Sequence, residues 1–258
     1  LIVFRYTKKE AAAWAARGVA VVNLSMESPE QPACFPQVTM DNVAAGRIAG
    51  EHLATLGLKD FAFIHEPLRK YSIARRQGFR EAVEKVGNFH EVVLPVSSWP
   101  EELRPHRLAA EMAKGMQDLP RPCGVYAKDD ILAVAALRAL RELGIRCPDD
   151  MPLVGTGDDV VFCHSNDPAL SSIKYPGREI GKEAAILLGR MMAGEHVPQG
   201  THVVVLPTLS TRESTGRVVL SDAVITTAMD LIRGAPLMQP IRVGELAHKT
   251  GVSRELLR

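Results

Sequence analysis

Short apolar segments alternate with amphipathic helical segments along the first 210 residues, and this alternation is what most constrains the fold. Glycine, proline or aspartate residues flank the apolar segments, which is typical of strands buried on both faces. The predicted strands span residues 19–24, 61–66, 90–96, 123–128 and 151–157. Strand–helix alternation predicts parallel sheets covered by helices on both faces, and therefore an α/β fold.

The predicted helices carry their own start and stop signals. Thr7 and Glu10 form a capping box, which opens the first helix. Further helices follow aspartates and end at glycines, with apolar residues gathered on one face of each. These signals are Asp41 and Asp130 at the starts, and Gly57, Gly144 and Gly194 at the ends.

Ligands of parallel sheets usually bind beyond the carboxyl ends of the strands. In this sequence those ends lie near Glu66, residues 128–130 and residues 157–159. No GxGxxG or GxxxxGK[ST] pattern follows a strand, so no nucleotide cofactor is expected. The four cysteines are widely spaced and the eight histidines do not cluster, which predicts reduced thiols and no metal site.

Composition narrows the class of protein further. Of the 258 residues, 46% are hydrophobic, enough for a large core, and the net charge of +1 argues against a surface that binds polyanions throughout. No apolar segment is long enough to cross a membrane, and charges from Arg5 onward interrupt any signal peptide. We therefore expect a cytoplasmic protein that does not bind membranes. Because the sequence starts at Leu1 without methionine, we expect residues before it.

The C-terminal part differs in character. Residues 211–222 are polar and are predicted to form a linker to a small all-α segment, residues 223–258. Its final stretch, RVGELAHKTGVSRELLR, places Gly251 four residues after Ala247, as a tight helix-turn-helix requires. An ordinary two-helix hairpin is the alternative. In a helix-turn-helix the second helix would read DNA through Ser253, Arg254, Glu255 and Arg258.

Several stretches resemble known families. VTMDNVAAGRIAGEHLATLGLKDFAFI, SIARRQGF and VGTGDDVVFCHSNDPALSSI resemble successive motifs of LacI/GalR-type sensor domains, which are two-lobed relatives of periplasmic sugar-binding proteins. The tail IRVGELAHKTGVSRELLR resembles the first helix-turn-helix of the AraC/XylS family. A LacI-type sensor followed by an AraC-type DNA-binding domain is the order found in the xylose-operon activators, the XylR group. CHSNDPALSSI and TRESTG also resemble that group.

The resemblance implies a periplasmic-binding-protein-like sensor over residues 1–210. Its first lobe would hold residues 1–66 and 174–198, and its second lobe residues 67–172 and 199–212. A further strand–helix unit would precede Leu1. The resemblance also implies a sugar effector in the cleft, D-xylose or another pentose, together with a homodimer and a double-stranded DNA operator as partners.

Two positions are carried over from the resemblance as effector-binding residues. Arg75, three residues before Gly78, stands where the family places an arginine that holds the effector, and a guanidinium suits paired hydroxyls. Pairing with a surface carboxylate is its alternative. In YAKDD, Asp129 would face the cleft and accept hydrogen bonds from hydroxyls, whereas Asp130 would mainly cap its helix.

One position departs from the family. Gly157 stands where the family has a ligand-binding aspartate, so either Asp158 replaces it or the effector is not the group's pentose. Weaker candidates are Asp41, which lines the cleft or caps its helix, and Glu66, Lys70 and Tyr71, which lie where the chain is expected to cross between lobes.

The leading hypothesis is a sugar-responsive transcription regulator, in which effector binding changes how a dimer fits its DNA sites. A transport-type sugar-binding protein without DNA activity is one alternative. A carbohydrate-active enzyme is another, in which aspartates 129, 130, 158 and 159 would supply an acid/base pair.

Overall fold

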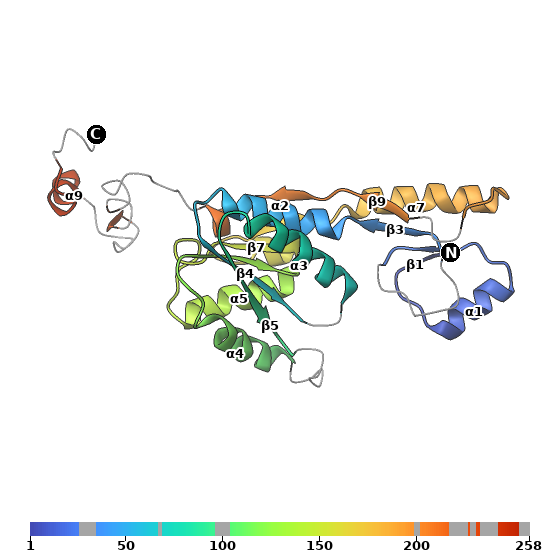
Figure 1. Ribbon diagram of the computed structural model, residues 1–258, viewed down its shortest axis with the longest axis horizontal. Helices are drawn as coiled ribbons and strands as arrows, with labels where there is room; N and C mark the ends of the chain where they lie inside the picture. Colours follow the sequence, from blue (N-terminus) through green and yellow to red (C-terminus); the bar gives the residue numbers. More distant parts are fainter. Residues whose placement is uncertain are drawn as a thin grey trace. The chain divides into compact units, whose positions relative to one another are not determined.

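The computed structural model describes residues 1–25, 35–66, 69–95, 104–198, 202–216, 227, 231–232 and 242–252. The chain forms two compact units, Leu1–Arg217 and Val218–Arg258. The first unit contains two sheets and the helices that cover them (Figure 1). No helix among the described residues is both long and apolar enough to span a membrane.

A four-stranded parallel sheet forms the first lobe. Its strands, in spatial order, are β1 (Ile2–Val3), β2 (Val22–Asn23), β3 (Gln37–Met40) and β9 (His202–Val205). Helix α1 (Lys8–Ala16) connects β1 to β2 and begins at the predicted capping box, in which the Thr7 hydroxyl accepts from Glu10 N at 3.2 Å. Helix α7 (Gly177–Met192) packs against all four strands.

A six-stranded sheet forms the second lobe. Its order is β10 (Thr208–Ser210), β8 (Ser171–Lys174), β7 (Leu153–Gly157), β6 (Cys123–Ala127), β4 (Asp60–His65) and β5 (Asn88–Val93). Only the edge strand β10 runs antiparallel to its neighbour. The predicted parallel α/β architecture is confirmed.

Helices cover both faces of this sheet (Figure 1). α2 (Asn42–Ala54) and α3 (Lys70–Val83) pack on the face that carries Phe61, Phe63 and Tyr126. α4 (Arg104–Met116) and α5 (Asp130–Glu142) pack on the opposite face, which carries Ala62 and Ile64. Residues 61–64 of β4 are all apolar because the side chains on both faces of the strand are buried. The short α6 (Val160–His164) packs against α5.

The chain crosses between the lobes at places other than those expected. Residues 42–66 belong to the second lobe, because α2 lies on the six-stranded sheet and β4 is one of its interior strands. Gly46 explains the position of α2, since a Cβ there would lie 1.9 Å from the carbonyl oxygen of Arg75 on α3. β9 pairs with β3 and therefore belongs to the first lobe, not the second.

The first half of the predicted linker is packed against the second lobe. Residues Glu213–Thr215 form a 3-10 helix, in which Ser214 and Thr215 are buried. The Ser214 hydroxyl donates to the carbonyl of Leu153 at 2.6 Å and accepts from Ser171 N at 2.8 Å. The chain leaves the first unit only after Arg217.

The second unit contains α9 (Val243–Thr250). This helix ends at Gly251, which adopts a left-handed conformation with φ 72°. Ala247 is buried, and its carbonyl accepts from Val252 N at 3.1 Å. The predicted DNA-contacting residues Ser253, Arg254, Glu255 and Arg258 lie outside the described residues, as do most of residues 223–241 of the predicted all-α segment.

Candidate functional site

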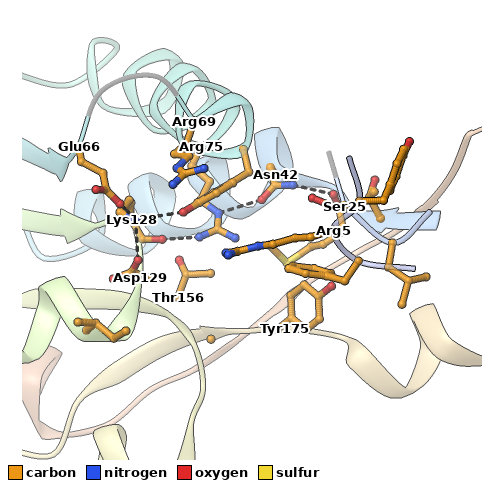
Figure 2. A pocket seen from close by; sticks show the side chains of 18 residues that line it. Arg5, Ser25, Asn42, Glu66, Arg69, Arg75, Lys128, Asp129, Thr156 and Tyr175 are labelled. Carbon is orange, nitrogen blue, oxygen red and sulfur yellow. Dashed lines mark hydrogen bonds and ion pairs between the residues drawn. The ribbon is translucent and has the colours of Figure 1, made fainter. Parts of the chain in front are cut away.

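A cavity of about 860 Å³ lies where the two lobes of the first unit meet (Figure 2). Its walls come from both lobes and include residues that follow the carboxyl ends of β1, β2, β4, β6 and β8. Ligands of parallel α/β sheets bind at such ends. The volume falls within the range of about 300–1,000 Å³ that is usual for small-molecule sites.

Arg75 forms the centre of one wall. Its side chain projects from α3 and is buried, and Nε donates to Asn42 Oδ1 at 2.9 Å. Nη1 donates to the carbonyl oxygen of Lys128, and the guanidinium lies 4.9 Å from the centre of the Tyr71 ring. Three separate elements thus fix one guanidinium group, which leaves its Nη2 amino group for a ligand.

Lys128 forms a second group of contacts, at the end of β6. Its ammonium group lies 2.6 Å from Glu66 Oε1 and 2.8 Å from Asp129 Oδ2, and donates to the Tyr71 hydroxyl at 3.0 Å. Burial opposes this charge, but the interactions with Asp129, Tyr71 and Glu66 together outweigh burial, and the pKa of Lys128 lies above its usual range. Lys128 therefore stays protonated and neutralises part of the charge on the two acids.

Of the two aspartates of YAKDD, Asp129 takes both expected roles, because it lines the cavity and also caps the helix. Asp129 caps α5, since its Oδ1 accepts from Leu132 N at 2.9 Å, and it also lines the cavity. Asp130 is buried in the second lobe, where it accepts from Ser172 Oγ at 2.6 Å and from Asp159 N at 3.0 Å. The expectation that Asp130 caps the helix is wrong, because the helix begins one residue earlier. Burial raises the pKa of Asp130.

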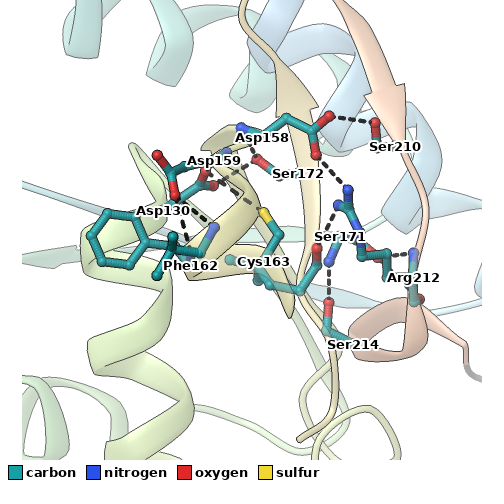
Figure 3. A network of polar contacts seen from close by, with 12 residues as sticks. Asp130, Asp158, Asp159, Phe162, Cys163, Ser171, Ser172, Ser210, Arg212 and Ser214 are labelled. Carbon is teal, nitrogen blue, oxygen red and sulfur yellow. Dashed lines mark hydrogen bonds and ion pairs between the residues drawn. The ribbon is translucent and has the colours of Figure 1, made fainter. Parts of the chain in front are cut away.

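Asp158 is directed away from the cavity that Gly157 lines. Its Oδ1 accepts from Arg212 Nη2 at 2.7 Å and its Oδ2 from Ser210 Oγ at 2.8 Å (Figure 3). Gly157 adopts φ 143°, and a Cβ there would lie 2.7 Å from Asp130 Oδ2. Glycine is therefore required at this position by the backbone and by Asp130. The structure does not bring Asp158 into the place of the missing family aspartate.

Of the four weaker candidates for effector binding, two line the cavity and two do not. Glu66 and Tyr71 line the cavity, whereas Asp41 and Lys70 are not among its lining residues. Asp41 caps α2, with its Oδ1 accepting from Ala44 N at 2.8 Å, which is one of the two roles left open for it. Lys70 is exposed at the first residue of α3.

The acid/base pair considered for an enzyme is not assembled from the four aspartates. Only Asp129 lines the cavity, while Asp130 and Asp158 are bound in the networks above. Asp159 caps α6, with its Oδ1 accepting from Val161 N at 2.9 Å. In the described part of the chain, no group of three or more histidine, cysteine or acidic residues is arranged to hold a metal ion.

Sequence reasoning missed several lining residues that no motif marked. Arg5 and Tyr175 follow β1 and β8, two strands that the sequence did not reveal. Asn42 was not predicted as a site residue because it lies in an amphipathic helix, although it directly follows Asp41, which caps that helix. Thr156 lies within a predicted strand. Position was a usable signal for Arg5, which directly follows the apolar residues 1–4, but not for Tyr175, which follows the polar strand β8.

Two α/β lobes around a polar cavity define the class of two-lobed ligand-binding proteins. Residues 51–215 match the family described as periplasmic binding protein-like domain, and the chain belongs to this family. It is 29% identical over 231 residues to the xylose operon regulatory protein of Haemophilus influenzae, covering 86% of this chain and 58% of that protein. It is 32% identical over 188 residues to the transcriptional regulator CelR of Thermobifida fusca, covering 72% and 53%. The chain thus spans little more than half the length of these relatives.

Solved structures show the same similarity. The structure of the xylose-binding transcription activator xylR matches with a TM-score of 0.74 and 25% identity, over 99% of this chain and 68% of that one. The complex of the transcriptional regulator CelR with cellobiose matches with a TM-score of 0.63 and 26% identity, over 83% and 64%. The predicted two-lobed fold class is confirmed.

Proposed function

We propose that this chain is the sensor part of a sugar-responsive transcription regulator, with the effector bound in the cavity between the lobes. The observation that carries the proposal is the fixed guanidinium of Arg75, held by Asn42 and the Lys128 carbonyl beside the Tyr71 ring. A rigid planar donor next to an aromatic face suits a hydroxyl-rich ring. The relatives support the proposal, because one is named as a xylose operon regulatory protein and the other as a transcriptional regulator.

The DNA-binding part of the proposal rests on the second unit. α9, its left-handed Gly251 and the buried Ala247 agree with the first half of an AraC/XylS-type helix-turn-helix. Ser253, Arg254, Glu255 and Arg258 remain the predicted DNA-contacting residues. We propose a homodimer that acts in the cytoplasm as an activator of pentose utilisation genes, with effector binding altering the fit of its two DNA-binding domains to an operator.

Calorimetric titration tests the sensor proposal. We would titrate the protein with D-xylose, other pentoses and hexoses, and repeat any binding with Arg75→Ala. We expect saturable binding that Arg75→Ala abolishes, because the variant removes the fixed donor from the cavity wall.

Arg76→Ala is the matched control. Arg76 is the next residue of α3, but its guanidinium bonds Glu91 at 2.6 and 2.8 Å and does not line the cavity. This variant should bind the sugar like the wild type. Equal affinity of wild type and Arg75→Ala would contradict the assignment of the site.

A further inference from the structure

The cavity wall carries more positive than negative charge. Its cationic side chains are Arg5, Arg69, Arg75 and Lys128, and its carboxylates are Glu66 and Asp129. Both carboxylates pair with Lys128, at 2.6 and 2.8 Å. In the ranges that the structure describes, no carboxylate forms an ion pair with any of the three arginines.

The three arginines approach one another from different parts of the fold. Arg5 follows β1 and belongs to the first lobe, whereas Arg69 directly precedes α3 and Arg75 lies within α3, in the second lobe. Figure 2 shows Arg5 extending across the cavity toward the guanidinium of Arg75, with Arg69 beside it. Like charges that converge on a concave surface create a positive potential there, and this potential attracts anions.

We propose that the ligand of this cavity is a sugar derivative with an oxyanion group, a sugar acid or a sugar phosphate, and that Arg5 and Arg69 bind the oxyanion. This inference rests on the proposed function, since it concerns the same cavity. Arginine is suited to the task because its planar donors match carboxylate and phosphate oxygens.

The hydrogen bonds within the protein indicate one role for Arg75 and another for Arg5 and Arg69. Arg75 uses Nε and Nη1 within the protein, so it offers one amino group and acts mainly on hydroxyls. Arg5 and Arg69 have no hydrogen bond to another described residue, and all of their donors are available. Because these two arginines come from opposite lobes, an oxyanion between them would draw the lobes together, which is how a ligand favours a closed state.

The test compares charged and neutral ligands of the same carbon skeleton. Calorimetric titrations would use D-xylose, D-xylonate and D-xylose 5-phosphate, the corresponding ribose series, and inorganic phosphate alone. We expect the best anionic sugar to bind at least about tenfold more tightly than its neutral parent. The advantage should shrink as the salt concentration rises from about 20 to about 200 mM, because salt screens exposed charges.

Variants that each remove one positive charge show which arginines bind the oxyanion. Arg5→Gln and Arg69→Gln should each lower the affinity for the anionic sugar about three- to tenfold and leave that for the neutral parent unchanged. Arg76→Gln, which removes a charge from the same helix outside the cavity, should change neither. A preference for xylonate or for the phosphate ester would identify the oxyanion, and either result supports the proposal.

Three outcomes would overturn the inference, and they are distinguishable. If neutral sugars bind as tightly as their anionic derivatives, the inference fails while the proposed function stands. If inorganic phosphate binds as tightly as the sugar phosphates, the cavity holds an anion without recognising the sugar. If no sugar of either kind binds, both the inference and the proposed function fail.

Discussion

Arg212 and Asp158 form a salt bridge in which Arg212 Nη2 lies 2.7 Å from Asp158 Oδ1, with both side chains largely buried at 16% and 12% exposure. Asp158 directly follows Gly157, which lines the cavity, and Arg212 directly precedes the 3-10 helix that ends the first unit (Figure 3). Arg212 Nη1 also donates to the carbonyl of Leu170 at 2.8 Å. The salt bridge therefore joins the edge of the cavity to the segment that leads into the second unit.

Arg212→Ala should lower the free energy of unfolding by about 2–4 kcal/mol, because it leaves Asp158 as a buried carboxylate without its cation. Urea unfolding followed by circular dichroism measures the change. Arg190→Ala is the control: Arg190 lies 2.7 Å from Glu195, but both side chains are 53% exposed. Its loss should cost at most about 1 kcal/mol. Similar effects of the two substitutions would contradict the role given to burial.

Gly46→Ala should destabilise the protein by at least about 2 kcal/mol, because the added Cβ would lie 1.9 Å from the carbonyl of Arg75 and push α2 and α3 apart. Gly181→Ala on α7 is the matched control, since its Cβ meets no atom within 4 Å. That substitution should stabilise by about 0.5–1 kcal/mol through helix propensity. Thermal unfolding of both variants measures the difference, and destabilisation by both would refute the steric explanation.

The sequence predicted the buried strands well and the exposed or polar ones poorly. β4, β6 and β7 are apolar because both of their faces are covered, and their positions were predicted closely. β8 was missed because it contains Ser171 and Ser172, whose hydroxyls are buried in side-chain networks rather than in an apolar layer. Periodicity detects apolar faces, and it does not detect buried hydroxyls that find partners far along the chain.

The points where the chain crosses between the lobes also could not be predicted from sequence patterns, because they depend on contacts between distant residues. Whether α2 packs on one sheet or the other depends on the close approach of Gly46 and Gly78 to the facing helix backbone, a contact between distant residues. Among the site residues, Arg75, Glu66, Tyr71 and Asp129 were found, because strand ends and a family motif marked them. Arg5 was marked only by its place after the apolar residues 1–4, and its part in the cavity became evident only with the position of β1.

Asn42→Ala should weaken effector binding about three- to tenfold, because Asn42 Oδ1 accepts from Arg75 Nε and thereby holds the guanidinium in place. Asn42 acts through Arg75, so it is a positioning residue. Asn42→Asp keeps an acceptor at the same place and should restore most of the affinity. Titration with whichever sugar binds the wild type gives the measurement. Equal weakening by both substitutions would show that the amide acts in another way.

His52 gives the stability a dependence on pH. Its Nε2 lies 2.9 Å from Thr215 Oγ1, and burial lowers its pKa below 6.5 in the folded protein. Since the unfolded chain takes up the proton more readily, stability is lost as the pH falls from about 6.5 toward the lowered folded value. The melting temperature of the wild type should therefore fall more steeply between pH 7.5 and 5.5 than that of His52→Gln, which keeps a polar side chain but does not titrate. Calorimetric melting of both proteins at three pH values measures this. If the melting temperatures of the two proteins differ by the same amount at every pH, His52 takes up its proton equally well in the folded and unfolded states.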